Sequence, residues 1–130
     1  MDQISAVTRG IKVSVRPRYE AASSLPAQNK YVHSYQVTIH NMGESSVQLL
    51  RREWIITDGD GSKRVVRGDG VIGEQPVIAP GFSHTYSSWC PLSFPAGKME
   101  GHYEMQDQTT EEVFQARVPM FKLTADFKQN

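Results

Sequence analysis

Residues 99–105, Met-Glu-Gly-His-Tyr-Glu-Met, carry the clearest secondary-structure signal in this chain. Apolar or small residues occupy the odd positions and polar residues the even ones, a period of two that is typical of a β-strand with one buried face. A helix would need its apolar residues three and four positions apart. The stretch therefore predicts a strand that packs on a core through Met99, Gly101, Tyr103 and Met105.

The same strand signal recurs along the rest of the chain. It predicts further strands at residues 11–16, 31–40, 47–56, 63–67, 82–88 and 112–118. Asp58-Gly59-Asp60-Gly61 predicts a tight hairpin turn, because Asp-Gly pairs tolerate the backbone angles that such turns need. Pro119 is expected to end the last strand, because it lacks the amide hydrogen that pairing requires.

The predicted strand at residues 47–56 changes face midway. Its first apolar residues, Val47 and Leu49, are odd-numbered, whereas Trp54 and Ile56 are even-numbered. Alternation cannot place both pairs on one face unless an extra residue is inserted. The sequence therefore predicts a β-bulge near Arg51-Arg52.

Seven or eight short strands with turns between them, and no convincing helix, predict an all-β protein. The expected architecture is an immunoglobulin/fibronectin type III-like antiparallel β-sandwich, and 130 residues suffice for a single domain. Trp54 is the expected core anchor between the two sheets, because a large aromatic residue fills that space.

The domain is expected to span residues 11–123, after a flexible N-terminus at 1–10 and before a frayed C-terminal tail at 124–130. Residues 16–30 contain two prolines and no period, so they predict a long mobile loop. The strand at Ile11–Arg16 is expected to form a sheet edge, which its charges and Pro17 would protect from open-ended pairing.

Composition excludes several classes of protein. With 14 Lys+Arg against 14 Asp+Glu the net charge is zero, which argues against nucleic-acid binding. Aliphatic runs such as Val47–Leu50 are far shorter than the roughly 20 residues that cross a bilayer, so no membrane insertion is expected. The single cysteine cannot form an internal disulfide, which favours a reducing compartment and hence the cytoplasm.

Residues 68–73, Gly-Asp-Gly-Val-Ile-Gly, match the GxGxxG pattern with which dinucleotide-binding folds approach a pyrophosphate at a helix N-terminus. Pro76 and Pro80 follow at once, so that helix is not expected here. Two interpretations remain. The glycines satisfy backbone geometry between strands, or they form a loop that binds an anion or phosphate with its amides. The residues of this second interpretation are Arg67, Gly68, Gly70 and Gly73.

No catalytic or metal-binding pattern emerges from the rest of the chain. The four histidines, His33, His40, His84 and His102, show none of the close spacings that metal sites use. Cys90 has apolar neighbours, which predict a packed and unreactive thiol. The sequence therefore predicts no catalytic residue, no cofactor and no metal, and we expect that the protein is not an enzyme.

Four blocks of the chain stand in a distinctive order and spacing: residues 13–19, 47–58, 68–76, and Cys90-Pro91-Leu92 with Gly97 and 99–105. From about Ile11 to Leu123 they resemble the bacterial ApaG family. The resemblance implies a fibronectin type III-like β-sandwich. It also implies a genetic association with cobalt resistance and magnesium transport, described as Co²⁺/Mg²⁺ efflux. Related domains in eukaryotic F-box substrate adaptors and a polymerase-delta-interacting protein favour a protein-binding role.

The functional hypothesis is a non-catalytic interaction module whose partner is a protein, linked to cobalt and magnesium without being a transporter itself. The alternative is nucleotide or polyphosphate binding, with a phosphate-containing small molecule held by residues 68–73. A monomer or weak homodimer is expected, because the edge strands of a sandwich are either protected or paired.

Overall fold

The computed structural model describes residues 3–125, which form an all-β sandwich. Two short 3-10 helices, Ala21–Ser23 and Pro26–Gln28, lie between the second and third strands. The strands are β1 Ile4–Thr8, β2 Ile11–Tyr19, β3 Tyr31–Asn41, β4 Val47–Thr57, β5 Lys63–Asp69, β6 Val77–Ile78, β7 Ser83–Leu92, β8 Ala96–Asp107 and β9 Val113–Thr124.

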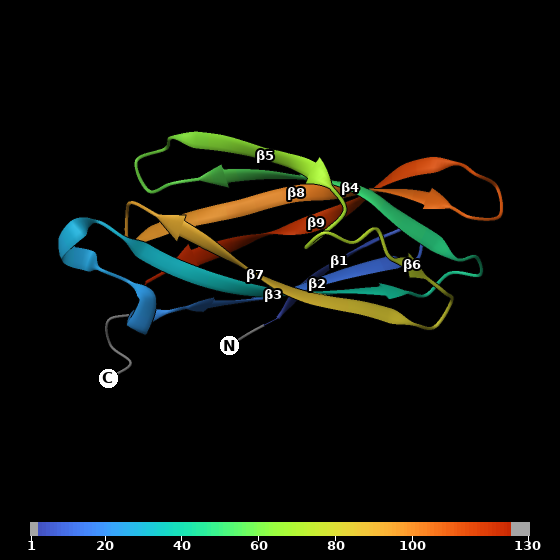
Figure 1. Ribbon diagram of the computed structural model, residues 1–130, viewed down its shortest axis with the longest axis horizontal. Coiled ribbons are helices and arrows are strands. Elements are labelled where there is room, and N and C mark those ends of the chain that lie inside the picture. Colours follow the sequence, from blue (N-terminus) through green and yellow to red (C-terminus); the bar gives the residue numbers. More distant parts are fainter. Residues whose placement is uncertain (1–2, 126–130) are drawn as a thin grey trace.

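The strands form two antiparallel sheets that stack as layers (Figure 1). One sheet has the order β1-β2-β3-β7; the other has the order β5-β4-β8-β9, and short β6 pairs with the start of β4. The predicted antiparallel sandwich is thereby confirmed. Its core forms from the alternating inward residues of both sheets, and Trp54, only 3% exposed, is the predicted anchor between them.

The predicted bulge in β4 is also confirmed. Leu49 pairs with Met105 and Arg51 with Glu104, so Leu50 is the extra residue on β4. The carbonyl of Leu50 accepts two hydrogen bonds of 2.8 Å, from the amide of Gly70 and from Nε2 of Gln75. The bulge therefore both switches the buried face of β4 and attaches the glycine-rich segment to it.

The N-terminal boundary of the domain differs from the prediction. Residues 1–10 were expected to be flexible, but Ile4–Thr8 pair with Ile11–Val15 as an antiparallel hairpin. Arg9 and Gly10, both with positive φ, form its two-residue turn. Consequently β1 is the edge of this sheet, and the expected edge at Ile11–Arg16 lies inside it. Met1 and Asp2 are outside the described residues.

The predicted mobile loop at residues 16–30 is wrong in its extent and its character. β2 continues to Tyr19, and the two 3-10 helices fill most of the remainder. The hydroxyl of Ser24 accepts from the amide of Val32 and donates to the carbonyl of Glu20, each at 2.8 Å. These bonds fasten the segment to β3.

The predicted end of pairing at Pro119 is wrong as well, because β9 runs on to Thr124. The register shifts between Met99 and Gly101, so Glu100 of β8 faces two residues of β9. Pro119 lies in this bulge, where the ladder does not require its amide. Thr124 thus belongs to the strand and not to the predicted tail, and residues 126–130 of that tail lie outside the described residues.

Candidate functional site

The two long sides of the sandwich differ. On one side β9 packs against β1 and β2, so the edges of the two sheets meet. On the other side, edge strands β5 and β7 flank two neighbouring cavities that both reach Tyr35 and Trp54 in the core. The first lies next to the glycine-rich segment, and the second next to Cys90 and Pro91. Arg64 bridges this open side at one end, because its Nη2 donates a 2.8 Å hydrogen bond to the carbonyl of Pro91.

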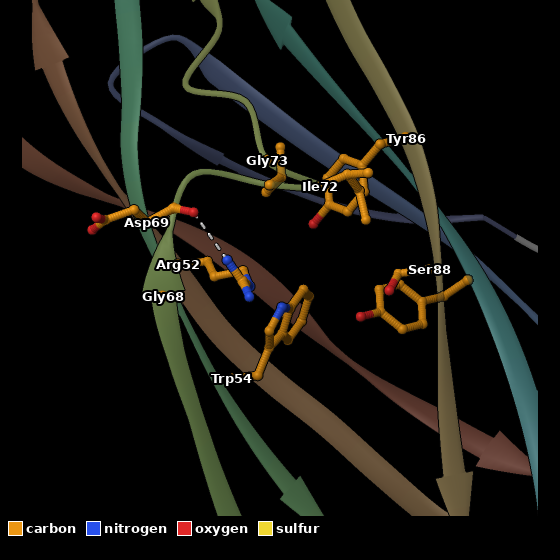
Figure 2. Close-up of a pocket in the computed structure, with 10 residues that line it drawn as sticks. Arg52, Trp54, Gly68, Asp69, Ile72, Gly73, Tyr86 and Ser88 are labelled. Carbon is orange, nitrogen blue, oxygen red and sulfur yellow. Dashed lines mark hydrogen bonds between the residues drawn. The ribbon is translucent and has the colours of Figure 1, made fainter.

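The cavity next to the glycine-rich segment has a volume of about 290 Å³. Figure 2 shows Arg52 and Trp54 pointing from β4 toward Tyr86 and Ser88 on β7, with the loop of Ile72 and Gly73 above them. The described residues that line it are Tyr35, Arg52, Trp54, Gly68, Asp69, Val71, Ile72, Gly73, Tyr86 and Ser88.

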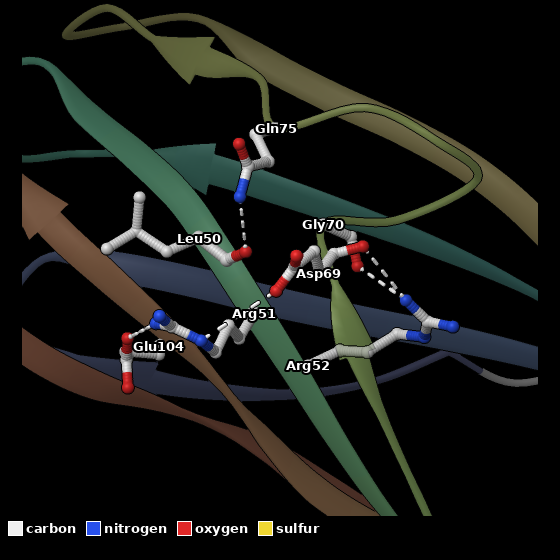
Figure 3. A network of polar contacts seen from close by, with 7 residues as sticks. All are labelled: Leu50, Arg51, Arg52, Asp69, Gly70, Gln75 and Glu104. Atoms are coloured by element: carbon white, nitrogen blue, oxygen red, sulfur yellow. Dashed lines mark hydrogen bonds and ion pairs between the residues drawn. The ribbon is translucent and has the colours of Figure 1, made fainter.

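Among the described residues of this lining, Arg52 is the one cationic side chain. Its Nη1 donates to the carbonyls of Asp69 at 3.2 Å and Gly70 at 2.9 Å (Figures 2 and 3). Within residues 3–125 the guanidinium forms no ion pair, and Nε and Nη2 donate no hydrogen bond. A guanidinium has five N–H donors and keeps its charge at any ordinary pH. Arg52 therefore brings an unpaired positive charge into a cavity between the sheets.

The glycines of the GxGxxG pattern have separate structural roles. A Cβ on Gly68 would lie 2.8 Å from Nη1 of Arg52, so this glycine makes room for the guanidinium. Gly70 adopts φ +60°, and a Cβ there would collide with the carbonyl of Glu74. Ile72 and Gly73, with φ of 47° and 73°, form the tip of a two-residue turn.

Most amides of this loop already have backbone partners. Gly70 donates to Leu50, while Val71 and Glu74 donate to each other's carbonyls. Among the described residues, only the tip amides of Ile72 and Gly73 in the segment 70–74 lack a hydrogen bond. The loop presents carbonyl oxygens to Arg52, and a carbonyl is not a group that attracts an anion.

Arg67, the predicted cationic partner of this loop, is turned to the outer face of its sheet, where it forms an ion pair with Glu53. This hydrogen bond lowers the pKa of Glu53. Arg51 also points outward and contacts Glu104 and Asp69, the latter at 3.7 Å (Figure 3).

The structure therefore brings Gly68 and Gly73 to the cavity lining and the Gly70 carbonyl to Arg52, but it does not bring Arg67 there. The sequence analysis missed Arg52. The face switch at the bulge was the available signal, since Arg52 lies two residues before inward-facing Trp54.

Tyrosine hydroxyls form the wall opposite Arg52. Tyr86 and Tyr103 are joined by a short hydroxyl–hydroxyl hydrogen bond. Burial raises the pKa of Tyr86, Tyr103 and Tyr35, so all three stay protonated and able to donate. The cavity thus offers hydrogen-bond donors beside a fixed positive charge.

The other residues considered from the sequence remain dispersed. The four histidines lie at separate places on β3, β7 and β8, and among residues 3–125 no group of three His, Cys, Asp or Glu side chains is arranged for a metal. Cys90 is buried, and burial raises the pKa of its thiol. No helix within the described part of the chain has the length and apolar character to cross a membrane.

A known protein family matches most of this chain. Residues 21–107, two thirds of the chain, match the family defined by the ApaG domain. The chain belongs to the ApaG family. The resemblance noted in the sequence is thereby confirmed, and the cavity around Arg52 lies within the matched part of this ApaG domain.

Relatives named Protein ApaG match nearly the whole chain. The protein from Mesorhizobium japonicum is 51% identical over 118 residues, which cover 91% of this chain and 90% of that protein. The protein from Brucella suis is 49% identical, with 92% and 91% covered. A crystal structure assigned to an ApaA protein of Bordetella pertussis has a TM-score of 0.87 at 41% identity, covering 91% of this chain and 95% of the other. Proteins named ApaG from separate bacteria thus share much of their sequence with this chain, and the Bordetella pertussis structure shares its architecture.

Proposed function

We propose that this protein is a non-catalytic binding module that receives an extended segment of a protein partner along its open side, between β5 and β7. One observation carries the proposal. The edges of the two sheets meet on one side of the sandwich, whereas on the other side two edge strands flank cavities that reach Trp54.

Edge strands carry unpaired backbone amides and carbonyls, which can pair with an added strand from another chain. Among the strands of residues 3–125, β5 pairs only with β4, and β7 only with β3. Val65 on β5 is exposed, and Val66 lines the second cavity together with Trp89 and Pro91. A peptide that followed either edge would gain backbone hydrogen bonds and could place alternate side chains in the cavities.

The chemistry of the cavity supports binding more than catalysis. Its tyrosines are held protonated, and the one carboxylate in the lining, Asp69, lies 3.7 Å from Arg51 on the outer face. A general base would need an accessible group with a pKa near the working pH. We therefore extend the proposal to the cobalt and magnesium link, which would act through the bound partner. The buried, unpaired Cys90 fits a cytoplasmic setting.

Two neighbouring serines of β7 supply a matched test. Ser88 lines both cavities, whereas Ser87 is exposed on the opposite face of the same strand. Ser88→Trp would fill the open side, and Ser87→Trp adds the same bulk elsewhere. Immobilised wild type, S87W and S88W are exposed to lysate of the source bacterium, and retained proteins are quantified by mass spectrometry. Circular dichroism verifies that each variant is folded.

We expect a defined protein retained by wild type and S87W and lost with S88W. Equal retention by all three folded proteins would contradict the proposed surface, and reproducible absence of any retained protein would contradict the interaction role.

A further inference from the structure

We propose that Arg52 is the receptor for a single phosphate group, which enters the cavity between β4 and β7 and binds side-on to the guanidinium. This site lies inside the cavity that the peptide-binding edges β5 and β7 flank, and small ligands test it independently of any peptide. It also differs from the sequence hypothesis, because its cation is Arg52 and its donors are side chains instead of loop amides.

The charge of the Arg52 guanidinium is unbalanced. Arg52 projects between the sheets beside Trp54, and among residues 3–125 it has no carboxylate partner. The two acidic residues beside Arg52 turn their carboxylates to the other face, where Asp69 pairs with Arg51 and Glu53 with Arg67. A partly buried cation without a counter-ion is unfavourable, and an anion that enters the cavity removes this cost.

The orientation of the guanidinium suits an oxyanion. Nη1 is held by the carbonyls of Asp69 and Gly70, which leaves the edge formed by Nε and Nη2 without a protein partner. Those two parallel N–H groups match two oxygens of one oxyanion, the geometry of bidentate arginine recognition. We call these two N–H groups of Nε and Nη2 the fork. The carbonyl contacts and the space above Gly68 hold the fork in place before a ligand arrives.

Hydroxyl donors near Arg52 favour phosphate over carboxylate. Tyr103 is fully buried, and Tyr86 is the partner of its hydroxyl. Because a buried hydroxyl uses its proton on the acceptor at hand, Tyr103 donates to Tyr86, and the Tyr86 proton is free to point into the cavity. The Ser88 hydroxyl lines the same space but is hydrogen-bonded to Tyr35, so Tyr86 supplies the additional donor. Donors beyond the two of the fork suit a phosphate, which has a third oxygen, better than a carboxylate, which has two.

The size of the cavity limits the ligand. A volume of about 290 Å³ accommodates one phosphate with a small attached group and is at the lower end of the range for whole small-molecule sites. With a single cation in the lining, the site does not match the charge of a pyrophosphate.

Arginine side-chain NMR observes the receptor directly. The Nε–H signals of ¹⁵N-labelled protein are followed at constant ionic strength while inorganic phosphate, AMP or acetate is added to about 20 mM, a range that covers millimolar dissociation constants. We expect a saturable shift of the Arg52 signal, with accompanying shifts of the Ile72 and Gly73 amides. Saturation by inorganic phosphate alone identifies free phosphate as the ligand, and tighter saturation by AMP identifies a phosphate ester.

Variants assign the shift to Arg52. Arg52→Gln removes the fork, and Gly68→Ala displaces it by placing a Cβ 2.8 Å from Nη1; either change is expected to weaken phosphate binding at least roughly tenfold. Arg67→Gln, on the same hairpin but on the outer face, is the matched control and should bind like wild type.

Three results would overturn the proposal: no saturable shift of the wild-type Arg52 signal, equal affinity for acetate and phosphate, or loss of binding in R67Q with retention in R52Q. The first readout needs no variant, so it decides the question even if R52Q does not fold.

Discussion

Replacing Trp54 with alanine should remove a large share of the stability of the sandwich. The indole is 3% exposed and packs edge-on against Tyr35, Tyr103 and Phe121, at ring-centroid distances of 5.5, 6.1 and 6.0 Å. Truncating a buried aromatic side chain costs about 3–5 kcal/mol, and each such ring pair adds about 0.5–1.5 kcal/mol beyond buried area. Three ring pairs place W54A at the upper end, about 5 kcal/mol, against a total of about 5–15 kcal/mol for a typical domain.

Urea unfolding followed by far-UV circular dichroism measures this loss. Trp89 is the matched control, because it is 57% exposed and its replacement by alanine should change stability by no more than about 0.5 kcal/mol. A W54A loss below about 1.5 kcal/mol, or an equal loss in W89A, would refute the assignment of Trp54 as the core anchor.

Three further predictions concern His33, Gly101 and Cys90. Burial lowers the pKa of His33 from 6.5 to about 4, so below pH 6.5 the unfolded chain binds a proton that the folded chain does not. The free energy of unfolding should therefore fall by about 2 kcal/mol from pH 7 to pH 5, a decrease that His33→Gln removes; a pH-independent wild type would be inconsistent with a neutral buried imidazole. Gly101→Ala would drive a Cβ into the backbone carbonyl of Glu53, and we expect a loss of about 2–4 kcal/mol in thermal unfolding; an unchanged melting temperature would disprove the close approach. Because burial raises the pKa of the Cys90 thiol, a thiol reagent at about pH 8 should modify the folded protein at least roughly tenfold more slowly than the unfolded protein; equal rates would show that the thiol is accessible.

Side-chain alternation was sufficient to predict most of the fold. Period-two patterns located β3 and β8, and the change of parity between Leu49 and Trp54 predicted the bulge that lies at Leu50. Such patterns arise because one face of each strand is buried. They therefore report which residues face the core wherever the two faces of a strand differ in polarity.

The errors lie where this signal is weak or where tertiary structure overrides a local rule. β1 exposes most of its residues, so its sequence lacks a clear apolar face, and the Arg9-Gly10 turn was not recognised. Pro119 indicated a strand end, but the bulge opposite Glu100 accommodates it. Neither feature can be derived from a residue's own chemistry, because each depends on the strand beside it.

The candidate site was predicted only in part for a related reason. The GxGxxG pattern directed attention to backbone amides and to Arg67, its neighbour in sequence. The relevant cation is Arg52, which is far from the glycines in sequence and reaches Gly70 because β4 and β5 are paired. Locating it required the register of the hairpin as well as the position of the bulge.

The contact of β9 with β1 and β2 has a consequence for biosynthesis. The side of the sandwich that this contact closes is built from the first and last strands, so it requires residues from Ile4 to Thr124 to be present together. While the ribosome is still translating the β9 segment, β8 lacks its outer neighbour. The inner face of β2 lacks β9, the strand that packs against it from the other sheet. The nascent chain therefore cannot complete its fold strand by strand during synthesis. Until β9 has been made, the apolar residues Val13 and Val15 stay accessible to chaperones.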